Sequence, residues 1–110
     1  MRVLIADDEP EMRRWLLRAL EFLGHEADAV GDGEELLRRA GNFQPDVVIS
    51  DIGLPGRNGI STGLRLREER PNGRVVLMTG DKTLAEKARE AGFSEVLDKP
   101  FSLDELLAVL

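Results

Sequence analysis

Short apolar runs alternate with amphipathic segments along this whole chain, and that alternation limits the fold more than any other feature. The apolar runs, most of them rich in Val, Ile and Leu, cover residues 2–8, 25–30, 46–51, 74–79 and 95–100. Apolar residues at helical spacing mark the segments between them, residues 10–23, 32–40, 60–69 and 82–91, and a last segment from residue 102. Gly24, Gly41 and Gly92 are expected to end three of these helices. The sequence therefore predicts five strand–helix units in series.

Strands that alternate with helices pair in parallel, because a helical crossover returns the chain in the same direction. We expect an α/β fold with a doubly wound, five-stranded parallel sheet and helices on both faces. A flavodoxin-like strand order, 2-1-3-4-5, would place the first and third strands side by side. Nothing interrupts the pattern, so residues 1–110 are expected to form a single domain. The last helix is short, and the sequence leaves open a stand-alone protein or a piece cut from a longer one.

Polar side chains stand at the carboxyl ends of four of the predicted strands. Asp7 and Asp8 end the first strand, Asp51 ends the third, Thr79 ends the fourth, and Lys99 belongs to the end of the fifth. The carboxyl ends of parallel strands meet at one edge of the sheet, where this fold class binds its ligands. We therefore expect these carboxylates, the hydroxyl and the ammonium to converge on one functional site.

Composition excludes several classes of protein. A hydrophobic share of 42% and a charged share of 33% are typical of a soluble globular domain. The absence of cysteine excludes disulfide frameworks and cysteine-based zinc sites. A net charge of -6 argues against direct binding of nucleic acid, which requires a basic face. No signal peptide is visible, and no apolar run approaches the roughly 20 residues that span a bilayer. We expect a soluble, cytoplasmic domain without membrane attachment.

The site residues, taken together, match a known family. Asp7–Asp8, Asp51, Thr79 and Lys99–Pro100, with the loop 54–59 and the segment 88–92, resemble the receiver domain of two-component response regulators. The resemblance covers residues 2–110. It implies a phosphoacceptor signalling domain in which Asp51 takes a phosphoryl group from a phosphohistidine of a sensor histidine kinase or a histidine phosphotransfer protein. The phosphorylated domain would shift its conformation to regulate a partner or an output domain, and a phosphorylation-dependent dimer is one form this could take.

The resemblance also implies a Mg²⁺ site, with Mn²⁺ as an alternative metal. Crowded carboxylates repel one another, and a hard divalent cation relieves that repulsion. The implied ligands are Asp8, Asp51 and the main-chain carbonyl of Gly53, with Asp7 acting through a metal-bound water. Lys99 and the Thr79 hydroxyl would contact oxygens of the phosphoryl group. Phosphoryl transfer depends mainly on positioning and electrostatics, so the domain would assist its own phosphorylation and dephosphorylation without being an enzyme.

Each site residue also has a purely structural interpretation. Asp8 is followed three residues later by Glu11, a pattern typical of a helix cap. Thr79 suits a strand end, and Asp51 taken alone suits the start of a loop. For the whole chain, the alternative function is a receiver-like scaffold that binds proteins without being phosphorylated. The complete set of acids together with Lys99 argues against it.

Two other functions on the same fold are disfavoured. A flavin-binding electron carrier needs a loop that cradles phosphate after the first strand, where Asp7, Asp8 and Glu9 would repel phosphate. An aspartate-based phosphatase needs a second acid two residues after its nucleophile, where this chain has Gly53.

Three positions near the site distinguish this chain within the family. Val96 stands three residues before Lys99, where the family has an aromatic residue, so we expect the conformational response to involve Thr79 and the helix over residues 82–91. Gly53 and Asp81 flank the site, and we expect both to affect the lifetime of the phosphoryl group.

Three apolar residues of the first predicted helix carry further expectations. Leu17 lies among charged residues and is a candidate docking point for a kinase helix, although single exposed apolar residues are common and need no function. Trp15 and Phe22 flank the apolar face, and we expect both to be partly buried.

Overall fold

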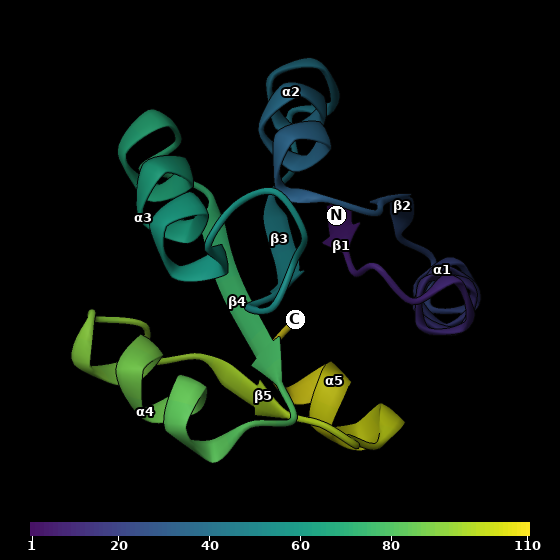
Figure 1. Cartoon of the computed structure of the whole chain (residues 1–110). Coiled ribbons are helices and arrows are strands. Elements are labelled where there is room, and N and C mark those ends of the chain that lie inside the picture. Colours follow the sequence, from purple (N-terminus) through teal and green to yellow (C-terminus); the bar gives the residue numbers. More distant parts are fainter.

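The computed structural model describes every residue from Met1 to Leu110 and contains the predicted alternation of strands and helices (Figure 1). The strands are β1 (Arg2–Ala6), β2 (Glu26–Val30), β3 (Val47–Asp51), β4 (Arg74–Thr79) and β5 (Val96–Asp98). The helices are α1 (Pro10–Phe22), α2 (Gly33–Phe43), α3 (Gly59–Glu69), α4 (Lys82–Glu90) and α5 (Leu103–Ala108). All strand pairs are parallel, in the order β2-β1-β3-β4-β5. The predicted flavodoxin-like sheet is confirmed.

The register of the strands brings their carboxyl ends level with one another. Ala6 of β1 lies opposite Ser50 of β3, so the residues that follow them leave neighbouring strands at the same height. Thr79 of β4 lies opposite Asp98 of β5 in the same way. The register therefore aligns the chain ends from which the predicted site residues project.

Helices cover both faces of the sheet (Figure 1), and the two faces bury different sets of side chains. Successive strand residues point to opposite faces. Val3 and Ile5 of β1 belong to the apolar cluster that includes Leu16 of α1 and Leu106 of α5. On the opposite face, Leu4 belongs to a cluster built with α2 and α3. A smaller cluster joins α4 to the sheet through residues Ile52, Leu77, Ala88 and Phe93.

One predicted helix end and one structural interpretation are wrong. Helix α2 does not stop at Gly41 but continues to Phe43, and Gln44 ends it in a left-handed conformation with a φ of 56°. Phe43 is buried in the core, so the extra turn gains apolar burial that outweighs the weak helix preference of Gly41. At the start of α1, Glu9 occupies the cap position and makes no side-chain cap bond. The capping interpretation of Asp8 is therefore wrong.

Two expectations for α1 need correction, and a third is confirmed. Phe22 is 85% exposed, because it lies two residues, about 200°, around the helix from the buried Leu20. Trp15 is partly buried as expected: it is 40% exposed and rests edge-on against Phe101, with ring centroids 5.9 Å apart. Leu17 is half-buried and packs against the core, so it is not an isolated exposed leucine available for docking.

None of the helices combines the length and the apolar character needed to cross a bilayer.

Candidate functional site

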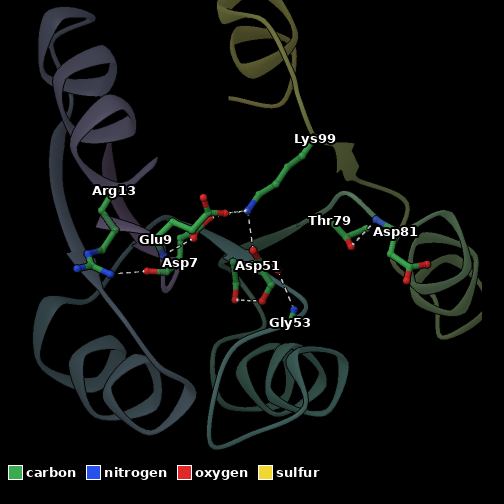
Figure 2. Close-up of polar contacts among 9 residues, drawn as sticks. Asp7, Glu9, Arg13, Asp51, Gly53, Thr79, Asp81 and Lys99 are labelled. Atoms are coloured by element: carbon green, nitrogen blue, oxygen red, sulfur yellow. Dashed lines mark hydrogen bonds and ion pairs between the residues drawn. The ribbon is translucent and has the colours of Figure 1, made fainter. Parts of the chain in front are cut away.

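The predicted site residues meet at the carboxyl edge of the sheet, and Figure 2 shows most of them around Asp51. Asp7 and Asp8 come from the β1–α1 loop, and Asp51 ends β3. One carboxylate oxygen from each of these three residues lies within 4.8 Å of the other two. Because β1 and β3 are neighbours in the sheet, acids far apart in the sequence become an acidic cluster.

Lys99, the residue that follows β5, joins this acidic cluster. Its Nζ donates to Oδ2 of Asp51 at 2.6 Å and to Oδ2 of Asp7 at 2.7 Å. Glu9 lies farther off, with Oε1 3.8 Å from the same nitrogen. Burial by itself lowers the pKa of Lys99, but hydrogen bonds and charges from Asp51 and Asp7 together raise that pKa above its ordinary value. Lys99 is therefore held as a cation between two carboxylates.

Asp51 has both carboxylate oxygens engaged. Oδ2 accepts from Lys99, while Oδ1 accepts from the backbone N–H of Gly53 at 2.8 Å. Its side chain is only 14% exposed. A Cβ at Gly53 would lie 3.5 Å from Oδ1, an ordinary van der Waals contact, so a side chain fits there without displacing Asp51. The carboxylate is thus fixed in direction at the mouth of the site.

Asp7 is the most enclosed of the three acids, with no exposed surface. Its Oδ1 accepts from the backbone N–H of Glu9 at 2.9 Å, and its Oδ2 accepts from Lys99. Asp8 differs, because it is exposed and its carboxylate takes part in no hydrogen bond or ion pair within the chain. Asp8 therefore presents free oxygen atoms to the site, and Asp7 does not.

Thr79 closes the opposite side of the site at the end of β4. It is buried, its Oγ1 accepts from the backbone N–H of Asp81 at 3.1 Å, and its carbonyl accepts from the backbone N–H of Lys99 at 2.9 Å. A cleft of about 360 Å³ opens beside Thr79 and Lys99, bordered by α4. The Thr79 hydroxyl donates to no group within the chain, so its hydrogen is available for another acceptor.

Asp81, two residues after Thr79, caps helix α4. Its Oδ1 accepts from the backbone N–H groups of Thr83 at 2.8 Å and Leu84 at 3.2 Å, so it caps the first turn of α4. In Figure 2 its carboxylate points away from Asp51. The Asp81 carboxylate therefore stabilises the start of α4.

Comparison with known proteins decides the family. The model of the response regulator receiver domain matches residues 3–110. The chain belongs to the response regulator receiver domain family. It is a signalling domain of two-component systems, and the resemblance found in the sequence is confirmed.

This receiver domain is similar to several characterised proteins. It is 39% identical to the DNA-binding transcriptional regulator NtrC of Azospirillum brasilense over 98% of this chain and 23% of NtrC. It is 36% identical to the transcriptional regulatory protein TcrA of Mycobacterium tuberculosis over 100% of this chain and 44% of TcrA. The receiver domain therefore spans less than half the length of these two relatives.

Solved receiver structures share the fold closely. Thermotoga maritima TrrA, solved in complex with Mg²⁺ and BeF, superposes with a TM-score of 0.87 at 31% identity, over 98% of this chain and 94% of TrrA. Vibrio cholerae CheY4 superposes with a TM-score of 0.87 at 27% identity, over 98% of this chain and 93% of CheY4.

Sequence reasoning missed two residues of the receiver domain that contact the site. Glu9 lies near Lys99, and the Arg13 guanidinium donates to the main-chain carbonyl of Asp7 at 2.8 Å. The signal for Arg13 was present, since a cation in the first turns of a helix opposes the helix dipole and so calls for another reason.

Proposed function

We propose that this receiver domain accepts a phosphoryl group on Asp51 from a phosphohistidine of a sensor histidine kinase or a histidine phosphotransfer protein, in a Mg²⁺-dependent reaction. The observation that carries the proposal is the fixed Asp51 carboxylate beside two further acids and the Lys99 ammonium. The phosphorylated domain would then regulate a partner or an output domain.

The acidic cluster fits a hard divalent cation. Mg²⁺ prefers oxygen ligands and keeps several waters, which matches three carboxylates that approach within 4.8 Å. Asp8 and Asp51 would bind the ion directly, and Asp7 through a water. The carbonyl oxygen of Gly53, which accepts no hydrogen bond within the chain, would be the main-chain ligand. Mn²⁺ offers similar chemistry and is the alternative ion. When bound, the metal supplies positive charge that offsets the carboxylates and the phosphoryl oxygens.

The transfer itself is a displacement at phosphorus. An oxygen of Asp51 forms a bond to phosphorus while the bond from phosphorus to the donor imidazole nitrogen breaks, and that nitrogen then takes up a proton from solvent. The product is an acyl phosphate and a neutral histidine. The loose transition state needs charge stabilisation and alignment more than a strong base, and no side chain is assigned that role.

Lys99 and Thr79 would hold the phosphoryl group once it is on Asp51. The Lys99 ammonium already contacts an Asp51 oxygen at 2.6 Å, so a small movement would let it pair with a phosphoryl oxygen. The Thr79 hydroxyl would donate to another oxygen while keeping its bond from the Asp81 backbone. This use of Thr79 would pull on the start of α4 and so link phosphorylation to the shape of that helix.

Intact-mass spectrometry tests the proposal. The protein is incubated with acetyl phosphate or phosphoramidate, with and without Mg²⁺, as the native chain, Asp51→Ala and Asp98→Ala. Asp98 ends β5 and is exposed, so it is a control acid outside the acidic cluster. We expect a phosphate-sized gain in the native chain and Asp98→Ala, dependent on Mg²⁺, and none in Asp51→Ala. Hydroxylamine should remove it, as it does from acyl phosphates.

The scaffold alternative is an outcome of the same experiment. If the native chain stays unmodified by the small donors and also by a phosphorylated histidine phosphotransfer protein, the phosphoacceptor proposal fails and protein binding without phosphorylation takes its place. If Asp51→Ala gains the same mass, Asp51 is not the acceptor.

A further inference from the structure

Arg13 reaches back from the first turns of α1 to the loop that carries two of the acids. Its Nη1 donates to the main-chain carbonyl oxygen of Asp7 at 2.8 Å, as Figure 2 shows. The side chain is half-buried, and a Cβ added at Gly31 would lie 3.2 Å from the same nitrogen. Gly31 thus leaves just enough space for the guanidinium beside the loop.

The position of Arg13 is not explained by helix stability. It lies four residues into α1, near the positive end of the helix dipole, where a cation is mildly unfavourable. No carboxylate pairs with it, and its only side-chain bond is the one to Asp7. The contact with the loop is therefore the feature of Arg13 that needs a functional reason.

That contact fixes the peptide unit that joins Asp7 to Asp8. A peptide unit is planar, so a donor that holds the Asp7 carbonyl also orients the bond leading to Asp8. Other bonds hold Asp7 itself, through its N–H to Val30 at 3.1 Å and through its side chain. Asp8 has no side-chain bond of its own, so the direction of its carboxylate depends on the backbone that Arg13 holds.

We propose that Arg13 is a positioning residue for divalent metal binding, which aims Asp8 into the acidic cluster by holding the Asp7 carbonyl. The inference rests on the proposed function, because it assumes that Mg²⁺ binds there. Arg13 does not touch the metal, and it acts through the Asp7–Asp8 peptide. Groups that orient metal ligands in this way commonly change metal affinity by about 10-fold or more when they are removed.

The sign of the effect separates positioning from simple electrostatics. Arg13→Met removes a positive charge near a cation site, and by charge alone it should strengthen Mg²⁺ binding. Positioning predicts the opposite, a weakening of about 10-fold. Arg14→Met removes the same charge from the next residue, which is exposed and makes no bond, so it is the matched control. Its affinity should stay within about twofold of the native value, because an exposed charge is largely screened.

The experiment measures Mg²⁺ affinity by isothermal titration calorimetry on the native chain, Arg13→Met, Arg13→Lys and Arg14→Met, with thermal unfolding of each. Arg13→Lys keeps the charge and one donor and should recover part of the lost affinity. Native-like affinity in Arg13→Met, or equal losses in Arg13→Met and Arg14→Met, would overturn the inference.

A second pair of variants is used if Arg13→Met does not fold. Gly31→Ala crowds the Arg13 guanidinium and should weaken Mg²⁺ binding. Gly41→Ala adds a Cβ that meets nothing within 4 Å and should leave Mg²⁺ binding unchanged. Equal Mg²⁺ affinities of Gly31→Ala and Gly41→Ala would then overturn the inference.

Failure of the underlying function gives a different result. If the native chain binds no Mg²⁺ at millimolar concentrations, the proposed metal site fails and the role of Arg13 fails with it. If the native chain binds Mg²⁺ and Asp8→Ala does not, while Arg13→Met is unaffected, the metal site stands and only the positioning role is lost.

Discussion

The Lys99 ammonium and the Asp51 carboxylate, 48 residues apart in the chain, are joined by a 2.6 Å hydrogen bond across the mouth of the site. The same ammonium binds Asp7, which has no exposed surface. Lys99 therefore compensates charge on two acids that the fold has brought together. The metal proposed for this site would compete with Lys99 for the same oxygens.

Lys99→Met should destabilise the protein by about 3 kcal/mol, because it leaves the buried Asp7 without its cation. It should also increase the response to Mg²⁺, since a divalent cation no longer competes with the ammonium for Asp7 and Asp51. We expect Mg²⁺ at about 10 mM to raise the thermal unfolding midpoint of Lys99→Met more than that of the native chain. Lys87→Met, on the exposed side of α4, is the charge-matched control. An equal Mg²⁺ response in all three proteins would contradict the competition.

The ion pair also predicts a loss of stability at alkaline pH. The pKa of Lys99 is raised in the folded protein above its ordinary value of 10.5. The stability that charged Lys99 contributes is therefore fully present below the pKa of Lys99 in the unfolded chain. It is lost as pH rises through the higher pKa of Lys99 in the folded protein. Urea unfolding of the native chain and of Lys99→Met is measured from neutral pH upward. The difference between their free energies of unfolding should be constant until about pH 10 and should shrink above it. A difference that changes near neutral pH would point to another group.

Two glycines in helices should respond in opposite ways to alanine. A Cβ at Gly59 would lie 2.5 Å from the backbone of Ile52, where β3 turns toward α3, so Gly59→Ala should cost about 2–3 kcal/mol through overpacking. Gly41 meets nothing within 4 Å and sits inside α2, so Gly41→Ala should add about 0.5–1 kcal/mol. Chemical denaturation of both variants checks the pair. Stabilisation by Gly59→Ala would mean that the loop after β3 yields easily.

The chain pattern predicted the fold and the acidic cluster because both depend on short-range signals. Apolar periodicity gave the elements, and a parallel sheet places Asp7, Asp8 and Asp51 at one edge. What escaped prediction depends on tertiary packing. The burial of Phe43 carries α2 past Gly41, and no local pattern reveals it. The direction of individual side chains escaped for the same reason, since the use of a carboxylate depends on which neighbours the folded chain supplies.

Val96 predicts where the protein should respond to phosphorylation. It is half-buried against the cluster that includes Ala88 of α4 and Phe93, and it has no ring to move between buried and exposed positions. With Mg²⁺ and fluoroberyllate, a phosphoryl mimic, we expect amide shift changes to concentrate at Thr79 and the first turn of α4 and to be small along β5. Nearly identical spectra with and without the mimic, or changes centred on β5, would contradict this route.

Asp81 tests whether the link from Thr79 to α4 depends on helix capping or on charge. Asp81→Ala removes the acceptor for Thr83 and Leu84 and should cost about 1 kcal/mol. Asp81→Asn keeps a capping oxygen and should cost only a few tenths. The backbone N–H of Asp81 also donates to the Thr79 hydroxyl oxygen. Loosening the first turn of α4 in Asp81→Ala should therefore slow phosphorylation by phosphoramidate and change the rate of phosphoryl loss. Asp81→Asn should change neither rate. Both rates are followed by intact mass, and equal changes in the two variants would assign the effect to the lost charge.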